Sequence, residues 1–154
     1  MAQIKCIKWI KAPKAEVYSY LLDPQNLNYL LRKYIDVELV NAAPSLAMGS
    51  EYTFKMSRYH FVQKVKIKFT EVQPGYKVSY KQTFGLFKKW KHTQLFEEKE
   101  GGTLVTDFIE LSMPFGFFGL LLDDLFIVKD MKRIIESRLE QAALHFSEKS
   151  EEES

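Results

Sequence analysis

Residues 114–146 have the sequence PFGFFGLLLDDLFIVKDMKRIIESRLEQAALHF, which is the longest segment with a helical pattern in the chain. Pro114 and Gly116 mark its start, and no proline follows them. Apolar residues recur at steps of three and four, which is the spacing of a helix with one buried face. These residues are Leu120, Ile127, Met131, Ile134, Ile135, Leu139, Ala142 and Phe146. The pattern predicts one helix of roughly 30 residues, about 45 Å long at 1.5 Å per residue.

The first turns of this predicted helix are apolar on almost every side. The residues concerned are Phe117, Phe118, Leu120, Leu121, Leu122, Leu125, Phe126, Ile127 and Val128. Such a helix end needs more than one covering surface, because a large exposed apolar patch is unfavourable in water. A sheet can cover one side, and a loop, a partner, a ligand or a membrane must cover the rest.

The composition indicates one ordinary globular domain. The 154 residues are enough for a sizeable core. Apolar residues at 46% and charged residues at 27% are typical of a soluble chain, and a net charge of +2 does not by itself indicate nucleic-acid binding. Cys6 is the only cysteine, which excludes an intrachain disulfide and is typical of a reducing compartment.

Targeting and membrane segments are not apparent. The N-terminal residues alternate from the start and show no signal-peptide pattern. The longest uncharged run, residues 111–122, is too short to span a bilayer and contains Pro114, Gly116 and Gly119. We therefore expect a cytoplasmic protein.

The N-terminal part predicts one strand followed by two short helices. Residues 3–10 alternate as a strand does. Pro13 suits a first helical turn, and apolar residues follow at helical spacing. Asp23 can cap the next helix while Pro24 takes its first position. The second helix would bury Leu27, Leu30 and Leu31.

Residues 35–112 predict six more strands, the first at residues 35–40. One alternating face is apolar, aromatic or amide, and lysines occupy the other. The first face comprises Tyr52, Phe54, Met56, Phe61, Gln63, Val65, Ile67, Phe69, Val78, Tyr80 and Gln82. This alternation predicts an antiparallel sheet that is covered on one side only.

The last two strands form a predicted hairpin over residues 87–112. A four-residue turn at residues 98–101 would place His92 opposite Asp107, Trp90 opposite Ile109 and Gln94 opposite Val105. A turn two residues longer or shorter would leave His92 and Asp107 diagonal to each other.

These elements predict an α+β fold in which a curved antiparallel sheet of about seven strands wraps around the long C-terminal helix. Two short helices follow the first strand. We expect residues 1–147 to form one domain. The acidic, serine-rich residues 148–154 have nothing to bury and are predicted to be disordered.

This order of elements, with these residues, resembles the START-like helix-grip superfamily (SRPBCC), which includes Bet v 1-like, START and polyketide cyclase/dehydrase groups. It is most similar to a bacterial ligand-binding subgroup, some members of which are labelled cell-division-inhibitor-like. The resemblance covers Ile4 to about Phe146. The matching motifs are the Val17, Asp23-Pro24 and Leu27 helix pair, Gly49-Ser50-Glu51-Tyr52, residues 84–92, residues 102–107, Pro114-Phe115-Gly116 and Arg138.

The chain departs from the subgroup pattern at two positions. Leu86 stands where the pattern has proline, and Gln94 stands where it has a second histidine. A catalytic or metal-binding role of that second histidine would therefore be absent here. The resemblance implies a helix-grip fold with an internal cavity. It does not imply one function, because the superfamily includes carriers, sensors, cyclases and oxygenase subunits.

His92 and Asp107 are the candidate catalytic residues. A carboxylate beside an imidazole on an apolar face would fix the tautomer and raise the basicity of a general base. In the alternative interpretation, the two residues satisfy each other, water or the backbone as buried polar groups.

The predicted ligand-binding face combines aromatic residues with a few polar anchors, as small-molecule sites do. Gln63, Gln82 and Gln94 either point inward as anchors or lie at strand ends in water. The predicted ligand-binding residues are Tyr52, Phe54, Met56, Gln63, Val65, Ile67, Tyr80, Gln82, Trp90, His92, Gln94, Asp107, Phe118 and Leu122. Residues 115–126 and 42–48 would form the mouth of the cavity.

We expect neither a metal nor a cofactor. The three histidines are His60, His92 and His145, which are scattered, and the motifs of phosphate loops and nucleophiles are missing. Lysines on the outer sheet face form either a solvated exterior or a weak contact with an anionic membrane surface. No nucleic-acid partner is expected, because exposed aromatic residues are not interleaved with these lysines. Either a monomer or a homodimer is compatible with the sequence.

The favoured function is binding or transport of a small hydrophobic molecule, such as a lipid, an isoprenoid or a polyketide-like compound, between the sheet and the C-terminal helix. One alternative is an enzyme of the polyketide cyclase/dehydrase type, with His92 as general base oriented by Asp107. Another is a protein-interaction or regulatory module whose apolar helix start docks a partner.

Overall fold

The computed structural model describes residues 2–112 and 124–153. The elements follow one another as β1 (Ala2–Ile10), α1 (Lys14–Leu22), the 3-10 helix η1 (Pro24–Asn26), α2 (Leu27–Leu31), β2 (Asp36–Ala42), β3 (Glu51–Arg58), β4 (Phe61–Gln73), β5 (Lys77–Phe84), β6 (Lys89–Lys99), β7 (Gly102–Ser112) and α3 (Asp124–Glu153).

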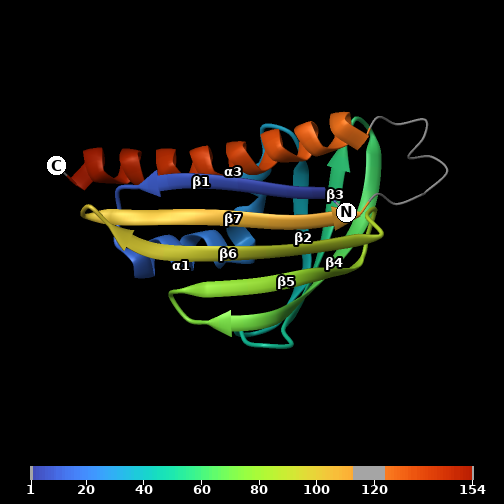
Figure 1. Ribbon diagram of the computed structural model, residues 1–154, viewed down its shortest axis with the longest axis horizontal. Helices are drawn as coiled ribbons and strands as arrows, with labels where there is room; N and C mark the ends of the chain where they lie inside the picture. The colour runs from blue at the N-terminus through green and yellow to red at the C-terminus, as the bar shows by residue number, and fades with distance from the viewer. Residues whose placement is uncertain (1, 113–123, 154) are drawn as a thin grey trace.

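The strands form one seven-stranded sheet in the order β1-β7-β6-β5-β4-β3-β2. Every neighbouring pair in this order is antiparallel. Figure 1 shows the sheet curving, with α3 lying lengthwise along β1. The predicted α+β arrangement of a curved antiparallel sheet and a long C-terminal helix is confirmed.

The core lies between the concave face of the sheet and the helices. One cluster joins β1, β6 and β7 to the C-terminal half of α3, through residues that include Phe96, Ile109 and Leu139. A second cluster joins β3, β4 and β5 to α2 and α3, through residues that include Phe54, Phe69 and Ile134. Burying this apolar surface is the main force that holds the sheet around the helix.

The junction between the first two helices follows the prediction from Asp23-Pro24. The Asp23 carboxylate accepts a hydrogen bond from the backbone N–H of Gln25 at 2.9 Å. Pro24 is the first residue of η1, where its missing N–H costs nothing. The helices bury Val17, Leu21, Leu30 and Leu31 against the sheet.

The register predicted for the β6–β7 hairpin is wrong by two residues. Lys99 pairs with Gly102, so the turn contains only Glu100 and Gly101. These two residues have φ angles of 50° and 78°, which close a tight turn whose twist suits the flanking strands. Glutamate rarely takes this conformation, so the sequence carries no strong signal for it.

This register changes which residues face each other across β6 and β7. Gln94 lies opposite Asp107, His92 opposite Ile109, and Trp90 opposite Leu111. His92 and Asp107 are therefore diagonal neighbours.

The C-terminal helix ends later than predicted. Helix α3 continues to Glu153, so residues 148–153, predicted to be disordered, are helical. Residues 147–153 are exposed, and burial does not explain their conformation. No proline or glycine follows Gly119 in the sequence to end the helix, and each added residue extends an established hydrogen-bond ladder. The predicted helix start at residues 114–123 lies outside the described residues.

The hairpin turn provides a test of this register. We expect Glu100→Asn to raise the free energy of unfolding by roughly 0.5–1 kcal/mol, because asparagine tolerates the left-handed backbone better than glutamate. Urea unfolding measures the change. Glu98→Asn is the matched control, since it removes the same charge from an exposed position within β6. A Glu100→Asn variant no more stable than this control would contradict the two-residue turn.

Candidate functional site

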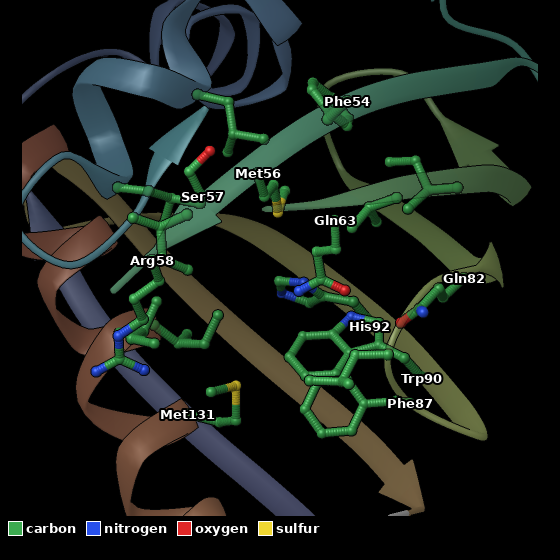
Figure 2. Close-up of a pocket in the computed structure, with 18 of the residues that line it drawn as sticks. Phe54, Met56, Ser57, Arg58, Gln63, Gln82, Phe87, Trp90, His92 and Met131 are labelled. Atoms are coloured by element: carbon green, nitrogen blue, oxygen red, sulfur yellow. The ribbon is translucent and has the colours of Figure 1, made fainter. Parts of the chain in front are cut away.

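A cavity of about 370 Å³ lies between the concave sheet and α3. Its walls are mostly apolar, and Figure 2 shows side chains from several elements pointing into it. The predicted ligand-binding residues that line it are Phe54, Met56, Gln63, Val65, Ile67, Tyr80, Gln82, Trp90 and His92. The structure therefore brings these residues together, while their role in binding stays a prediction.

Other predicted residues do not reach the cavity wall. Tyr52 is buried in the second core cluster, with its ring centroid 5.2 Å from that of Phe69. Gln94 and Asp107 are fully buried behind the wall, beside His92. Phe118 and Leu122 lie outside the described residues.

The sequence analysis missed several residues that line the cavity. They are Leu27, Leu31, Ile35, Ser57, Arg58, Tyr59, Leu86, Phe87, Met131, Ile134, Ile135 and Arg138; Phe61, predicted on the same inner face of the sheet, also lines it. The clearest missed signal is Arg138, because it occupies the apolar stripe that Met131, Ile134 and Ile135 define on α3. A charged residue on a buried helix face requires a partner inside the fold.

One of the two segments predicted to form the mouth packs against the core. Residues 42–48 do not line the cavity, and Ala42, Ala43 and Leu46 pack against the second core cluster instead. Hydrogen bonds hold this loop in place, from Gly49 N–H to the Phe69 carbonyl at 2.7 Å and from the Ser50 hydroxyl to the Ser45 carbonyl at 2.9 Å. Of the other predicted mouth segment, residues 115–123 lie outside the described residues.

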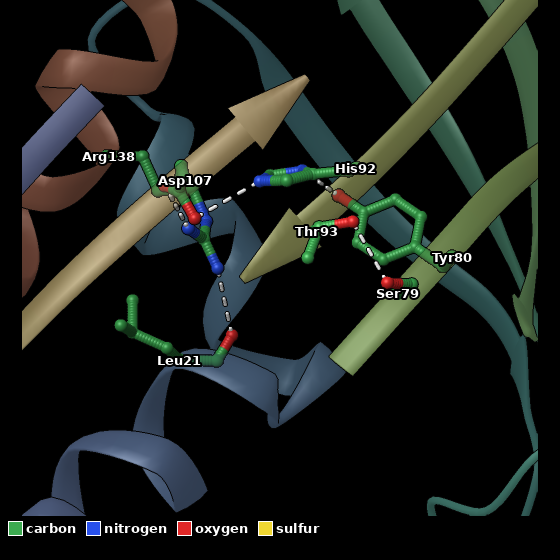
Figure 3. A network of polar contacts seen from close by, with 7 residues as sticks. All are labelled: Leu21, Ser79, Tyr80, His92, Thr93, Asp107 and Arg138. Atoms are coloured by element: carbon green, nitrogen blue, oxygen red, sulfur yellow. Dashed lines mark hydrogen bonds and ion pairs between the residues drawn. The ribbon is translucent and has the colours of Figure 1, made fainter. Parts of the chain in front are cut away.

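A chain of polar contacts forms one end of the cavity and joins four elements (Figure 3). The Tyr80 hydroxyl on β5 lies 2.6 Å from Nδ1 of His92 on β6. Nε2 of His92 lies 3.1 Å from Oδ1 of Asp107 on β7. Arg138 on α3 donates from Nη1 to Oδ2 of Asp107 at 3.1 Å. The diagonal register thus still brings His92 and Asp107 into contact, because diagonal neighbours on one face remain within reach of long side chains.

The contact between His92 and Asp107 is not a linear hydrogen bond. Nε2 of His92 and Oδ1 of Asp107 are both buried, and neither has a well-aligned hydrogen-bond partner among the described residues. The contact is close but poorly directed, so its effect on the imidazole is mainly electrostatic.

Arg138 is the partner of Asp107 that the sequence analysis did not name. Its Nη2 also donates to the Leu21 carbonyl at 3.3 Å. With the amide oxygen of Gln94 turned toward the guanidinium, Gln94 accepts from Nη1 at 3.2 Å and from Nη2 at 2.8 Å. The guanidinium is therefore enclosed by protein acceptors.

These surroundings set the protonation states of the side chains in this series of polar contacts. Burial acts to raise the pKa of Asp107, but Arg138 and His92 outweigh it, and the net shift lowers this pKa. Burial lowers the pKa of His92 in spite of the nearby carboxylate. Burial also raises the pKa of Tyr80 to about 12. Near neutral pH, Tyr80 is therefore a phenol, His92 a neutral imidazole and Asp107 a carboxylate that contacts the guanidinium of Arg138.

The described residues contain no group of three His, Cys, Asp or Glu side chains placed to hold a metal ion. Within residues 2–112 and 124–153, no helix is long and apolar enough to cross a bilayer.

Solved structures with the same fold are numerous. The protein TTHA0849 from Thermus thermophilus is 19% identical, with a TM-score of 0.78 over 97% of this chain and 99% of its own. Ara h 8.0201 is 12% identical, with a TM-score of 0.72 over 96% and 98% of the two chains. The di-domain ARO/CYC protein StfQ from the steffimycin biosynthetic pathway is 13% identical, with a TM-score of 0.71 over 96% of this chain and 51% of its own.

These likenesses establish the helix-grip fold. None of the curated proteins matches the chain in sequence. The sequence model of one family, described as polyketide cyclase / dehydrase and lipid transport, matches residues 7–146. The predicted membership of the SRPBCC superfamily is thereby confirmed, and the chain belongs to the polyketide cyclase/dehydrase and lipid transport family.

Proposed function

We propose that the protein binds and carries a small, mainly apolar molecule in the cavity between the sheet and α3. The observation that carries this proposal is the apolar-walled space of about 370 Å³, which core side chains leave unfilled. Natural cores contain few voids larger than a water molecule, because an empty cavity costs stability. Small-molecule sites in proteins begin at roughly 300 Å³.

Apolar burial is the driving force for this binding. A ligand that buries about 250 Å² of apolar surface gains roughly 6 kcal/mol before the cost of association. Useful affinity therefore does not need many hydrogen bonds. The polar groups near Tyr80 and His92 would orient one end of the ligand, while Phe54, Val65 and Ile67 contact its apolar body.

A pair of substitutions on one strand tests the proposal. Val65 faces the cavity, whereas Val62 on the same strand is 51% exposed on the outside. We expect Val65→Trp to weaken the binding of pyrene, an apolar fluorescent probe, at least tenfold, because the indole fills the cavity. Val62→Trp should leave pyrene affinity within about twofold of the wild type. Fluorescence titration measures both, and a wild-type protein that does not bind pyrene would refute the proposal.

A second function, an enzyme of the cyclase or dehydrase type, is favoured by the chain from Tyr80 through His92 to Asp107. A neutral imidazole beside a carboxylate, reaching the cavity through a phenol, is suited to general acid–base catalysis. The family description includes both cyclases and lipid transport.

The substitution His92→Asn separates the two functions. A carrier should co-purify with the same molecule whether residue 92 is histidine or asparagine. An enzyme should yield a product that has lost water or formed a new ring in the wild type, and unreacted substrate in the variant. Mass spectrometry of the molecules extracted from each protein distinguishes these results. The same unmodified molecule from both proteins would exclude the enzyme.

The cavity end of the molecule also has the composition of a membrane-contacting surface. Figure 1 shows the β3–β4 turn, the β5–β6 connection and the start of α3 at one end of the molecule. Exposed apolar residues there are Tyr59, Phe61, Val62, Phe84, Leu86 and Phe126, and exposed lysines beside them are Lys64, Lys88 and Lys89. Apolar side chains flanked by lysines match the interface of an anionic membrane, from which an apolar ligand could be collected.

Vesicle binding tests this surface. We expect Phe61→Ser to reduce co-sedimentation with phosphatidylcholine/phosphatidylglycerol vesicles severalfold, because the ring no longer enters the interface. Val40→Ser is the matched control, since Val40 and Phe61 are 58% and 59% exposed but lie on different strands. Equal losses in the two variants, or no vesicle binding by the wild type, would refute the membrane contact.

A further inference from the structure

We propose that the polar end of the cavity is a hydrogen-bond acceptor, the phenolic oxygen of Tyr80, and that the site selects apolar molecules bearing a neutral hydroxyl or N–H donor. This inference rests on the proposed binding function and specifies the class of ligand. It is based on a series of contacts from Arg138 through Asp107 and His92 to Tyr80, in which each contact determines which atom of the next side chain donates or accepts.

The Asp107 carboxylate fixes the tautomer of His92. Asp107 is held as a carboxylate by Arg138, which donates to its Oδ2 at 3.1 Å. The other oxygen, Oδ1, lies 3.1 Å from Nε2 of His92. A ring nitrogen that faced this oxygen with its lone pair would suffer repulsion between two acceptors. The proton of the neutral imidazole therefore resides on Nε2, although the contact is not linear.

Nδ1 of His92 fixes the direction of the Tyr80 hydroxyl. With its proton on Nε2, the imidazole presents Nδ1 as an acceptor. The Tyr80 oxygen is 2.6 Å from Nδ1, so the phenol donates its one proton to His92. Tyr80 and His92 are directly paired across β5 and β6, which keeps the two groups together. The phenolic oxygen then has acceptor capacity only.

The remaining hydrogen-bonding capacity of the Tyr80 oxygen decides which ligand groups fit at this end of the cavity. Tyr80 lines the cavity and is half-buried. The Tyr80 oxygen keeps lone-pair capacity that its contact with His92 does not use, and this capacity can accept from a ligand. A ligand hydroxyl or N–H can pair with that lone pair. An ether or carbonyl oxygen placed there would face another acceptor without a proton between them.

Both arginines in the cavity wall that the described residues form already contact a carboxylate, although the buried Nε of Arg58 has no hydrogen-bond partner among those residues. Arg138 is enclosed by Asp107, Gln94 and the Leu21 carbonyl. Arg58, the other arginine that lines the cavity, donates from Nη2 to Oδ1 of Asp130 at 3.0 Å. A carboxylate in this apolar space would therefore lose its hydration, and the arginines it would meet already contact a carboxylate.

The amides of Gln63 and Gln82 and the hydroxyls of Ser57 and Tyr59 also line the cavity. Hydroxyls, like amides, both donate and accept. The oxygen of Gln82, when turned toward the β5–β6 connection, accepts from the backbone N–H groups of Gly85 and Leu86, each at 3.0 Å. Gln63 has no side-chain hydrogen bond among the described residues. An amide both donates and accepts, so these residues do not distinguish donors from acceptors. The discrimination rests on Tyr80.

Displacement of bound pyrene by three naphthalenes tests the inference on the full chain. 2-Naphthol carries a donor, 2-methoxynaphthalene carries an acceptor only, and 2-naphthoate carries a negative charge. We expect 2-naphthol to bind about fivefold tighter than 2-methoxynaphthalene, because its hydroxyl donates to the Tyr80 oxygen whereas the ether oxygen faces it as a second acceptor. We also expect 2-naphthol to bind tighter than 2-naphthoate. If the protein binds pyrene but binds 2-methoxynaphthalene or 2-naphthoate as tightly as 2-naphthol, or more tightly, the inference is overturned while the proposed function stands. A wild type that does not bind pyrene would overturn both.

The substitution Asp107→Asn tests the origin of the preference. With its oxygen kept on Arg138, the new amide would present N–H to Nε2 of His92, and the imidazole proton would move to Nδ1. That proton would be donated to the Tyr80 oxygen, and the phenol O–H would turn toward the cavity. We therefore expect the preference to shift at least fivefold toward 2-methoxynaphthalene.

Glu110→Gln is the matched control, because it removes a carboxylate from the opposite face of the same strand without touching His92. It should leave the ratio of the two affinities unchanged. A folded Asp107→Asn protein with the wild-type ratio would overturn the inference, as would an equal shift in the control. If Asp107→Asn does not fold, as judged by near-ultraviolet circular dichroism, the wild-type comparison of 2-naphthol with the ether decides alone.

Discussion

The contact between Arg138 and Asp107 is the interaction on which the site depends. It joins α3 to the middle of β7 inside the core, where both side chains are almost fully buried. A buried charge without its partner is strongly unfavourable, so this pair restricts how α3 can lie against the sheet. The same carboxylate faces His92, and His92 in turn holds Tyr80. One buried ion pair thus links the position of the helix to the polarity of the cavity wall.

Arg138 also marks a boundary along α3. Toward the C-terminus, Leu139, Ala142 and Phe146 belong to the packed first core cluster. Toward the N-terminus, Met131, Ile134 and Ile135 line the cavity. The sheet curves away from a straight helix, so one helix cannot fill the whole concave face. The packed half supplies the stability through apolar burial, which leaves the other half free to hold open space and the polar chain at their boundary.

This arrangement accounts for a family that includes both carriers and enzymes. In small-molecule sites, apolar walls generally supply affinity, whereas a few polar side chains decide orientation and specificity. In this protein those side chains come from β5, β6, β7 and α3 and contact one another (Figure 3). Their shared architecture does not by itself decide between a carrier and an enzyme.

The helices, the strands and their buried faces could largely be predicted from the sequence. Alternation and helical spacing are local properties, and they predicted the seven strands, the Asp23-Pro24 junction and the buried face of α3, together with much of the cavity wall from β3 to β6. Which residues meet could not be predicted from these patterns. The β6–β7 register depends on a left-handed Glu100, the partner of Asp107 comes from a helix that is distant in sequence, and Ala42, Ala43 and Leu46 pack against the core. Local periodicity fixes the direction of a side chain but not its neighbour, because register and helix placement are set by contacts between distant segments.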